Sequence, residues 1–100
     1  MAVLSTDAID ERLRALPGWS RQGSAIVHQF SFAGFPEAVA FVGRLVPGAE
    51  AADHHPDLTI NYRKVTVSYS THSEGGVTEK DFAGAERANE AARETGEGST

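Results

Sequence analysis

Three of the four histidines in this chain of 100 residues lie close together in the sequence. His54 and His55 are adjacent and are followed by Pro56, while His72 comes later and His28 stands apart. Imidazole is the side chain whose ordinary pKa allows it both to donate and to accept a proton near neutral pH. A histidine cluster in so small a chain predicts proton-transfer chemistry or metal binding.

The composition narrows the classes of function. The chain has no cysteine, which excludes thiolate metal sites, disulfides and thiol nucleophiles. Fourteen acidic residues against nine basic ones give a net charge of −5, and no basic stripe is present to bind nucleic acid. No apolar run approaches the length of a membrane span, and the N-terminus lacks a signal pattern. We therefore expect a cytoplasmic enzyme or binding module without a nucleic-acid or membrane partner.

The elements that must position the histidines follow from apolar spacing and capping residues. Ser5 or Thr6 can cap a first helix, and Thr78 with Asp81 resembles a capping box that opens a last one. Three segments carry apolar residues at helical spacing and are predicted helices: residues 5–16, 35–46 and 79–94.

Breaks in the apolar pattern set the remaining boundaries. Pro47 and Gly48 are expected to end the second helix, so that residues up to Ala52 form a separate turn. Two strands are expected over residues 19–21 and 24–32, separated by a turn.

A β-hairpin is predicted directly after the paired histidines. Apolar residues alternate with polar ones along both of its strands: Leu58, Ile60 and Tyr62, then Val65, Val67 and Tyr69. The parity changes between the strands, so paired residue numbers must have an odd sum, which requires an even-numbered turn near residues 62–64. If the second strand continues to His72, that residue lies opposite Asp53 or His55. The hairpin thus folds the histidines together.

These elements predict an α+β fold. The order helix-strand-strand-helix-strand-strand-helix suits a four-stranded antiparallel sheet with three helices packed on one face, because each helix has one apolar stripe. Residues 1–95 are expected to form a single domain. Residues 96–100 are polar and rich in glycine, and we expect a disordered tail.

Seven residues occur in the order and spacing of a known signature. An acidic residue is followed, after three intervening positions, by His-His-Pro. An aromatic residue follows after five further positions, a histidine after nine more and an aspartate after eight more. These residues are Glu50, His54, His55, Pro56, Tyr62, His72 and Asp81. The pattern and the element order resemble the pterin-4a-carbinolamine dehydratase family, also described as the dimerisation cofactor of a homeodomain transcription factor. The resemblance covers the whole chain.

The resemblance implies a hydro-lyase whose substrate is a pterin and which needs no cofactor and no metal. Such an enzyme dehydrates 4a-hydroxytetrahydropterin to quinonoid dihydropterin and so recycles the cofactor of aromatic amino-acid hydroxylases. The step needs a general acid and a general base on one small ring, which histidines supply. The residues that match the family's catalytic positions are His54, His55, His72 and Asp81. Those that match its substrate-binding positions are Glu50, His54, His55, Pro56, Thr71, His72, Ser73, Glu74 and Lys80.

The resemblance also implies homodimers that join two sheets edge to edge, and often homotetramers. An exposed edge strand such as residues 24–32 would supply the contact. Two residues depart from the commoner pattern of the family: Leu58 replaces a tryptophan, and Lys80 replaces an arginine.

Other interpretations of the same residues remain open. The paired histidines could belong to a polar loop that ends a helix, or three histidines and an acid could bind zinc. Adjacent histidines on a strand point to opposite faces, which disfavours zinc. Proteins of this fold can also act as non-catalytic binding or assembly factors. His28 is expected to be a core or interface residue, and Tyr62 could either pack or contact substrate.

Overall fold

The elements of the chain form two layers, a sheet and a layer of helices. The computed structural model describes residues 3–96. Their helices and strands are, in chain order, α1 (Thr6–Leu13), β1 (Ser20–Gln22), β2 (Ala25–Ser31), α2 (Phe35–Ala52), β3 (Asp57–Asn61), β4 (Lys64–Tyr69), the short 3₁₀ helix η1 (His72–Glu74) and α3 (Glu79–Thr95). The strands pair antiparallel in the order β1-β2-β4-β3. The predicted α+β fold, with its three helices and four-stranded antiparallel sheet, is confirmed.

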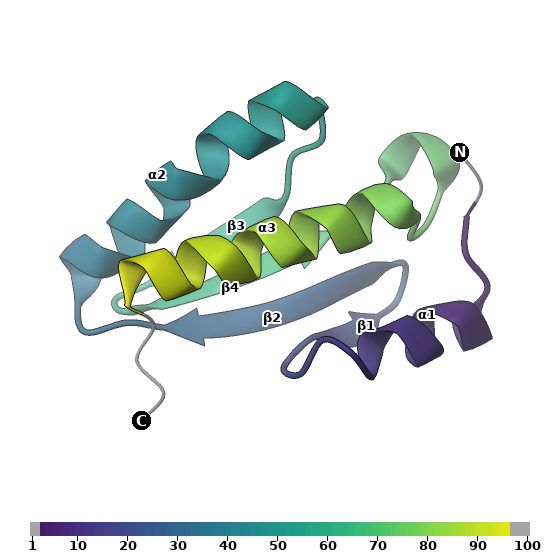
Figure 1. Cartoon of the computed structure of the whole chain (residues 1–100), viewed down its shortest axis with the longest axis horizontal. Coiled ribbons are helices and arrows are strands. Elements are labelled where there is room, and N and C mark those ends of the chain that lie inside the picture. The colour runs from purple at the N-terminus through teal and green to yellow at the C-terminus, as the bar shows by residue number, and fades with distance from the viewer. Residues whose placement is uncertain (1–2, 97–100) are drawn as a thin grey trace.

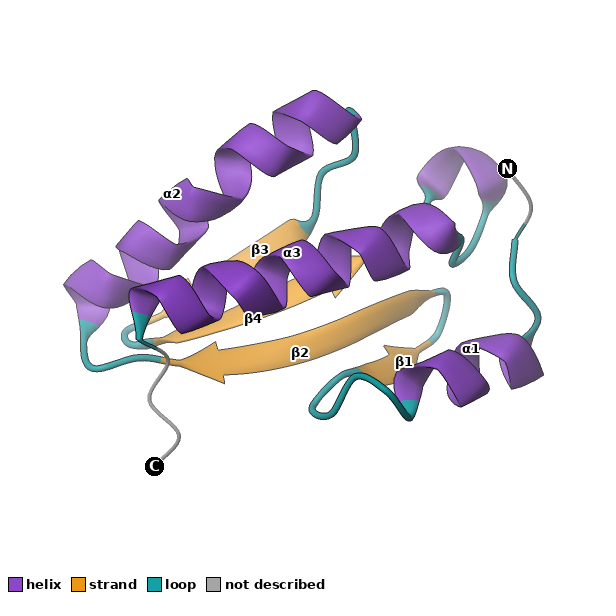
Figure 2. Cartoon of the chain, viewed as in Figure 1, coloured by secondary structure: helices purple, strands orange, loops and turns teal. Residues whose placement is uncertain are grey.

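The helices cover one face of this sheet. Figures 1 and 2 show α2 and α3 lying across the strands and α1 lying beside β1. Val65, Val67 and Tyr69 of β4 are buried beneath them, while the alternate residues Thr66 and Ser68 remain partly exposed. This alternation is the signature of a sheet with one covered face and one open face.

The predicted helix starts agree with the caps in the structure. The Ser5 hydroxyl accepts a hydrogen bond from the Ala8 backbone N–H at 3.1 Å, which caps α1. Thr78 and Asp81 form the capping box of α3, in which each side chain binds a backbone N–H of the other end of the box. The capping box thus places Asp81 in the first turn of α3 and binds one of its two oxygens.

The predicted end of the second helix is wrong. α2 runs for 18 residues through Pro47 to Ala52, instead of ending at residue 46. Proline removes one backbone hydrogen bond inside a helix. Here the buried stripe that includes Leu45 continues one turn later with Ala49, so packing on the sheet outweighs the missing bond. The longer helix brings its end to the paired histidines.

The hairpin has the predicted odd-sum register. Asp57 pairs with Ser68 and Asn61 with Lys64, so residues 62 and 63 form a two-residue turn. The second strand is shorter than predicted, because β4 ends at Tyr69 and His72 lies in η1.

The early end of β4 has a local cause in the loop that follows it. Thr71 makes an isolated bridge to Gly76, and Gly75 adopts the left-handed conformation with φ 77°. The bridge and the turn at Gly75 direct the chain toward α3, so His72 is outside the strand ladder and is not paired with Asp53 or His55 as predicted.

The expectation that residues 24–32 form a sheet edge is wrong for the first part of that strand, which pairs with β1. β2 lies between β1 and β4, so the edges of the sheet are β1 and β3. β3 is exposed along its length, including the apolar residues Leu58 and Ile60. β1 covers only the first part of β2, up to Val27, so within the described residues the end of β2, residues 29–31, has a strand neighbour in β4 alone.

The end of the chain is described only in part. Gly96 is the C-cap of α3, with φ 80°. The rest of the predicted tail, residues 97–100, lies outside the described residues. No helix within residues 3–96 is both long enough and apolar enough to cross a membrane.

Candidate active site

The paired histidines lie in the turn that joins α2 to β3. Asp53 adopts a left-handed conformation, with φ 50°, and ends the helix. The backbone N–H groups of Asp53 and His54 donate to the carbonyls of Glu50 and Ala49, at 3.3 and 3.1 Å. This tight helix end places the two imidazoles in different surroundings. The His54 side chain is 9% exposed, whereas that of His55 is 54% exposed.

His54 is held by a buried carboxylate. Its Nε2 lies 2.6 Å from Oδ1 of Asp81, whose side chain is fully buried. An ionised carboxylate only accepts hydrogen bonds, so Nε2 carries the proton, and in the neutral ring Nδ1 has the free lone pair. The ring also stacks on Tyr69, with centroids 5.9 Å apart. The Asp81 carboxylate and the Tyr69 ring thus hold His54 in position, and the carboxylate favours the tautomer with its proton on Nε2.

The phenol of Tyr69 belongs to the same buried region. Desolvation by burial raises the pKa of Tyr69 above its ordinary value of 10.0, the charge of Arg87 opposes this increase, and the charge of Asp81 adds to it. Tyr69 therefore stays neutral at physiological pH and presents an uncharged ring to His54.

His55 has a carboxylate partner of its own, but in solvent. Its Nε2 lies 2.6 Å from Oε2 of Glu50, which is in the last turn of α2 and is 70% exposed. The same reasoning assigns the Nε2 proton to this contact. Exposed pairs of this kind contribute little to stability, so Glu50 holds His55 less firmly than Asp81 holds His54.

An apolar groove lies beside His55, between α2 and β3. Its volume is about 150 Å³, and its walls are Val42, Leu45, Val46, Ala49, Glu50, His55, Pro56 and Leu58. Leu58 thus lines a concave surface that carries a histidine and a carboxylate.

The third histidine reaches this region through its neighbour in the sequence. The Thr71 hydroxyl donates to Oδ2 of Asp81 at 2.8 Å, and His72 follows it as the first residue of η1. His72, Ser73 and Glu74 are all exposed.

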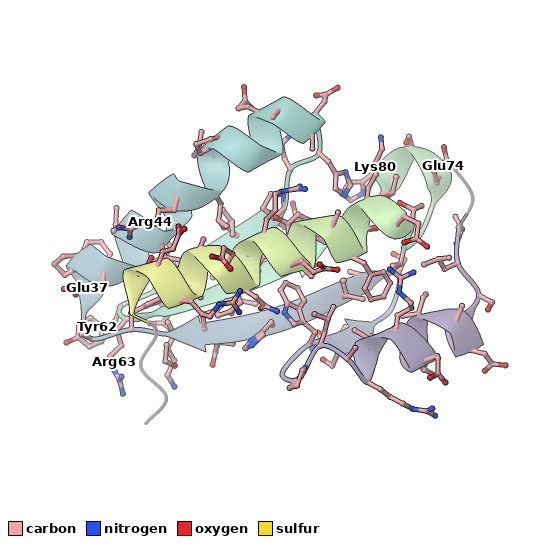
Figure 3. The ribbon with its side chains drawn as sticks, viewed as in Figure 1. Glu37, Arg44, Tyr62, Arg63, Glu74 and Lys80 are labelled. Carbon is pink, nitrogen blue, oxygen red and sulfur yellow. The ribbon has the colours of Figure 1, made fainter. Side chains whose placement is uncertain are left out.

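Lys80 belongs to the same end of the molecule. Figure 3 shows Glu74 and Lys80 there, with Lys80 pointing outward from the start of α3. The structure thus gathers the sequence-predicted residues around the end of α2, η1 and the start of α3.

Tyr62 and His28 lie outside the region that holds the other predicted site residues. Tyr62 is in the β3–β4 turn and is 66% exposed, and Figure 3 shows it at the opposite end of the molecule from Lys80. The five residues of β3 lie between it and Pro56, and six steps of extended chain separate the two by roughly 20 Å. His28 packs between Trp19, edge-on at 5.4 Å, and Phe30, stacked at 4.0 Å. Its surroundings are those of a packing residue.

One residue of the network was not predicted as a site residue. The Thr78 hydroxyl lies 2.8 Å from that of Thr71, and its backbone N–H donates to Oδ2 of Asp81 at 2.8 Å. The capping-box pattern marked Thr78 as a helix cap, and that pattern was the available signal. It does not reveal that the cap also joins the histidine network.

The larger cavities of the described residues are elsewhere. One of about 600 Å³ lies between α1 and α3, against Arg12, Phe82 and Asn89, and no histidine lines it. Within residues 3–96, no three histidine, aspartate or glutamate side chains converge as a metal-binding group.

The imidazoles of His54 and His55 are each bound through Nε2 to a carboxylate, one buried and one exposed, on an α+β scaffold. Such an arrangement has the groups that general acid–base chemistry requires. The model of the family described as pterin 4 alpha carbinolamine dehydratase matches residues 2–91. The chain therefore belongs to the pterin-4a-carbinolamine dehydratase family, a family of hydro-lyases.

Individual relatives agree with this assignment. A protein of Roseiflexus castenholzii named for pterin-4-alpha-carbinolamine dehydratase activity is 55% identical over 83 residues, which cover 82% of this chain and 89% of that protein. A relative from Mycobacteroides abscessus with the same name is 46% identical over 86 residues, covering 86% of this chain and 92% of the relative.

Solved structures extend the comparison to the fold. A transcriptional coactivator/pterin dehydratase from Brucella melitensis superposes with a TM-score of 0.86 at 39% identity, covering 90% of this chain and 98% of that one. A pterin dehydratase-like protein identified as a RuBisCO assembly factor in the alpha-carboxysome has a TM-score of 0.60 at 20% identity, covering 74% and 86%. The second likeness concerns the fold alone.

Proposed function

We propose that this chain dehydrates 4a-hydroxytetrahydropterin to quinonoid dihydropterin by histidine acid–base catalysis, without a metal or a cofactor. The observation that carries the proposal is the buried His54–Asp81 pair, which leaves one imidazole nitrogen available in a defined tautomer. Family membership supplies the substrate class.

The chemistry divides between a base and an acid. The hydroxyl on C4a leaves as water and needs a proton, while a ring nitrogen of the pterin loses one. His54 suits the base, because its Nδ1 lone pair is free while Asp81 stabilises the positive charge that the ring gains. His55 and His72 are exposed, where water can stabilise a charged imidazolium, and either suits the acid.

The remaining site residues are proposed to bind the pterin. Pro56 and Leu58 line the groove beside His55, and Glu50 orients that ring. Ser73, Glu74 and Lys80 present exposed polar groups at the same end of the molecule and suit polar atoms of the substrate.

We further propose that two copies of the chain associate through β3. Six large apolar side chains on α2, on β3 and in the turn that follows β3 are exposed, and we call them the α2–β3 face: Phe35, Val39, Val46, Leu58, Ile60 and Tyr62. β3 is also a sheet edge with an unpaired side. Edge pairing with a second copy would cover both, and a homotetramer would bury more of α2.

A net charge of −5 favours small-molecule and protein partners over nucleic acid, and the cytoplasm is the proposed compartment.

The test is turnover of freshly prepared 4a-hydroxytetrahydropterin, compared with its unaided dehydration. His54→Ala and His72→Ala should each lower the rate about 10²–10⁴-fold, the usual loss of one acid–base group. His28→Ala is the control, and its rate per folded site should stay close to that of the wild type. A wild-type rate equal to the no-enzyme rate would overturn the catalytic proposal and favour a non-catalytic binding protein of this fold.

A further inference from the structure

The hydroxyl proton of Thr71 and one of its oxygen lone pairs are used inside the protein. Thr71 is buried, and its single O–H donates to Oδ2 of Asp81 at 2.8 Å. Its oxygen lies 2.8 Å from that of Thr78. Because the one Thr71 proton is used on the carboxylate, Thr78 must be the donor in this second contact. A substrate could therefore accept a hydrogen bond from this hydroxyl only if the buried contact with Asp81 were broken, and burial of Thr71 restricts access to the remaining lone pair.

The hydrogen bonds of this cluster share one direction. The Lys80 backbone N–H donates to the Thr78 hydroxyl at 3.2 Å, Thr78 donates to Thr71, and Thr71 donates to Asp81. The chain of donors ends on a carboxylate that only accepts. Hydrogen bonds in such a chain polarise one another, so each strengthens the next.

The two oxygens of Asp81 have separate tasks in this arrangement. Oδ2 accepts from the Thr71 hydroxyl and from the Thr78 backbone N–H, both at 2.8 Å. Two donors on one oxygen fix the plane of the carboxylate. Oδ1 is then left to face Nε2 of His54 at 2.6 Å.

We infer that Thr71 is a positioning residue that sets the tautomer of His54 through Asp81, rather than a residue whose hydroxyl contacts the substrate. This inference rests on the proposed function, because it matters for turnover only if His54 is the base. Without the Thr71 hydroxyl, the carboxylate can rotate and bind Nε2–H less well. The neutral ring then also populates the form with its proton on Nδ1, which cannot accept a proton there.

The test compares variants at position 71 with a matched threonine. Thr71→Val keeps the β-branched shape and removes the hydroxyl, Thr71→Ser restores the hydroxyl, and Thr66→Val makes the same change on β4 at a hydroxyl bonded to Gln29 rather than to Asp81. Thr71→Val should lower kcat about tenfold, as expected for a lost hydrogen bond to a charged group, with KM changed by less than about twofold. Thr71→Ser should recover most of kcat, and Thr66→Val should resemble the wild type.

A second readout does not depend on turnover. The ¹⁵N spectrum of the His54 ring should show the Nε2–H form in the ligand-free wild type and a mixture of tautomers in Thr71→Val. If Thr71→Val does not fold, Thr71→Ala removes the same hydroxyl without adding volume. An unchanged ¹⁵N spectrum, or a loss confined to KM, would overturn the inference. An inactive wild type with the predicted ¹⁵N change would instead overturn the proposed function and leave the tautomer control standing.

Discussion

The two site carboxylates make the same contact with histidine in opposite surroundings. Asp81 binds Nε2 of His54 in a fully buried position, and Glu50 binds Nε2 of His55 at the surface, each at 2.6 Å. Removing one partner of a buried pair leaves the remaining group without a hydrogen-bond partner. At the surface, water takes the place of the group that was removed. Although the two contacts have the same length, we therefore expect loss of the Asp81 contact to have a larger effect than loss of the Glu50 contact.

Asp81→Asn should lower kcat by about 10²-fold or more, because an amide can present N–H as well as oxygen to the imidazole and no longer selects its tautomer. Glu50→Gln is the matched control, with an expected change of less than about threefold, since the pair is exposed. Steady-state rates of both variants, together with their unfolding midpoints, check the prediction. Similar losses in the two variants would show that burial does not distinguish these carboxylates.

The sequence could predict the chemical residues of the site better than their contacts. The spacing of His54, His72 and Asp81 identified the family, and the capping-box pattern placed Asp81 at a helix start. The Thr71–Asp81 hydrogen bond joins the loop after β4 to α3, so it depends on tertiary packing that no local pattern encodes. Tyr62 matches the spacing signature, but it lies at the far end of the hairpin from the site. Membership of the signature therefore did not predict its position in space.

At the scale of elements, strand parity was informative and strand ends were not. Alternation fixed the register of β3 on β4, because a shift by one residue would turn every side chain to the other face. The continuation of α2 through Pro47 depends on burial of Ala49, and the end of β4 depends on Gly75 and Gly76. Those boundaries are set by packing and by backbone turns outside the repeating pattern.

Packing of α3 on the sheet depends on the absence of a side chain at Gly84. A Cβ at this position would lie 2.5 Å from Cε1 of the Tyr69 ring, which is itself buried. Nothing lies within 4 Å of the corresponding position at Gly43, in the middle of α2. Alanine substitutions at Gly84 and Gly43 therefore distinguish a steric clash with Tyr69 from the gain in helix propensity.

Gly84→Ala should lower the free energy of unfolding by about 1–3 kcal/mol, because overpacking against a buried ring exceeds the gain in helix propensity. Gly43→Ala should raise it by up to about 1 kcal/mol, since alanine is the better helix former and the space is open. Urea unfolding of the two variants and the wild type measures both changes. Stabilisation by Gly84→Ala would mean that Tyr69 can move away, and the stacking on His54 would then be loose.

At the scale of the whole molecule, one ion pair joins the first helix to the last. Arg12 of α1 lies 2.7 Å from Glu79 of α3, and its guanidinium also lies over the Phe82 ring at 4.5 Å. The hydrogen bond from Arg12 lowers the pKa of Glu79 below its ordinary value of 4.5. The folded state therefore favours ionised Glu79, so this contribution is present above pH 4.5 and is lost as the pH falls through the lowered pKa.

Wild type and Glu79→Gln should accordingly differ in thermal unfolding midpoint at neutral pH and converge as the pH falls below 4.5. The difference at neutral pH should also shrink at high salt, because both groups are partly exposed. Melting curves over a pH series, at low and at high salt, provide the measurement. A difference that stays constant with pH would show that the variant acts through packing rather than charge.

The proposed association of two copies can be tested at the α2–β3 face. β1 and β3 are both edges, but all three residues of β1 are polar while β3 carries Leu58 and Ile60 in exposed positions. An exposed edge with apolar side chains is a template for another strand, and a charge on it opposes pairing.

Ile60→Lys should therefore shift the protein toward monomer in sedimentation velocity, whereas Gln22→Lys on β1 should leave association unchanged. A wild-type protein that sediments as a monomer at all concentrations, or dissociation caused by Gln22→Lys alone, would contradict association through β3. Because His55 and Leu58 line the groove next to this face, the Ile60→Lys variant also tests whether the site requires a second copy, through its rate per folded chain.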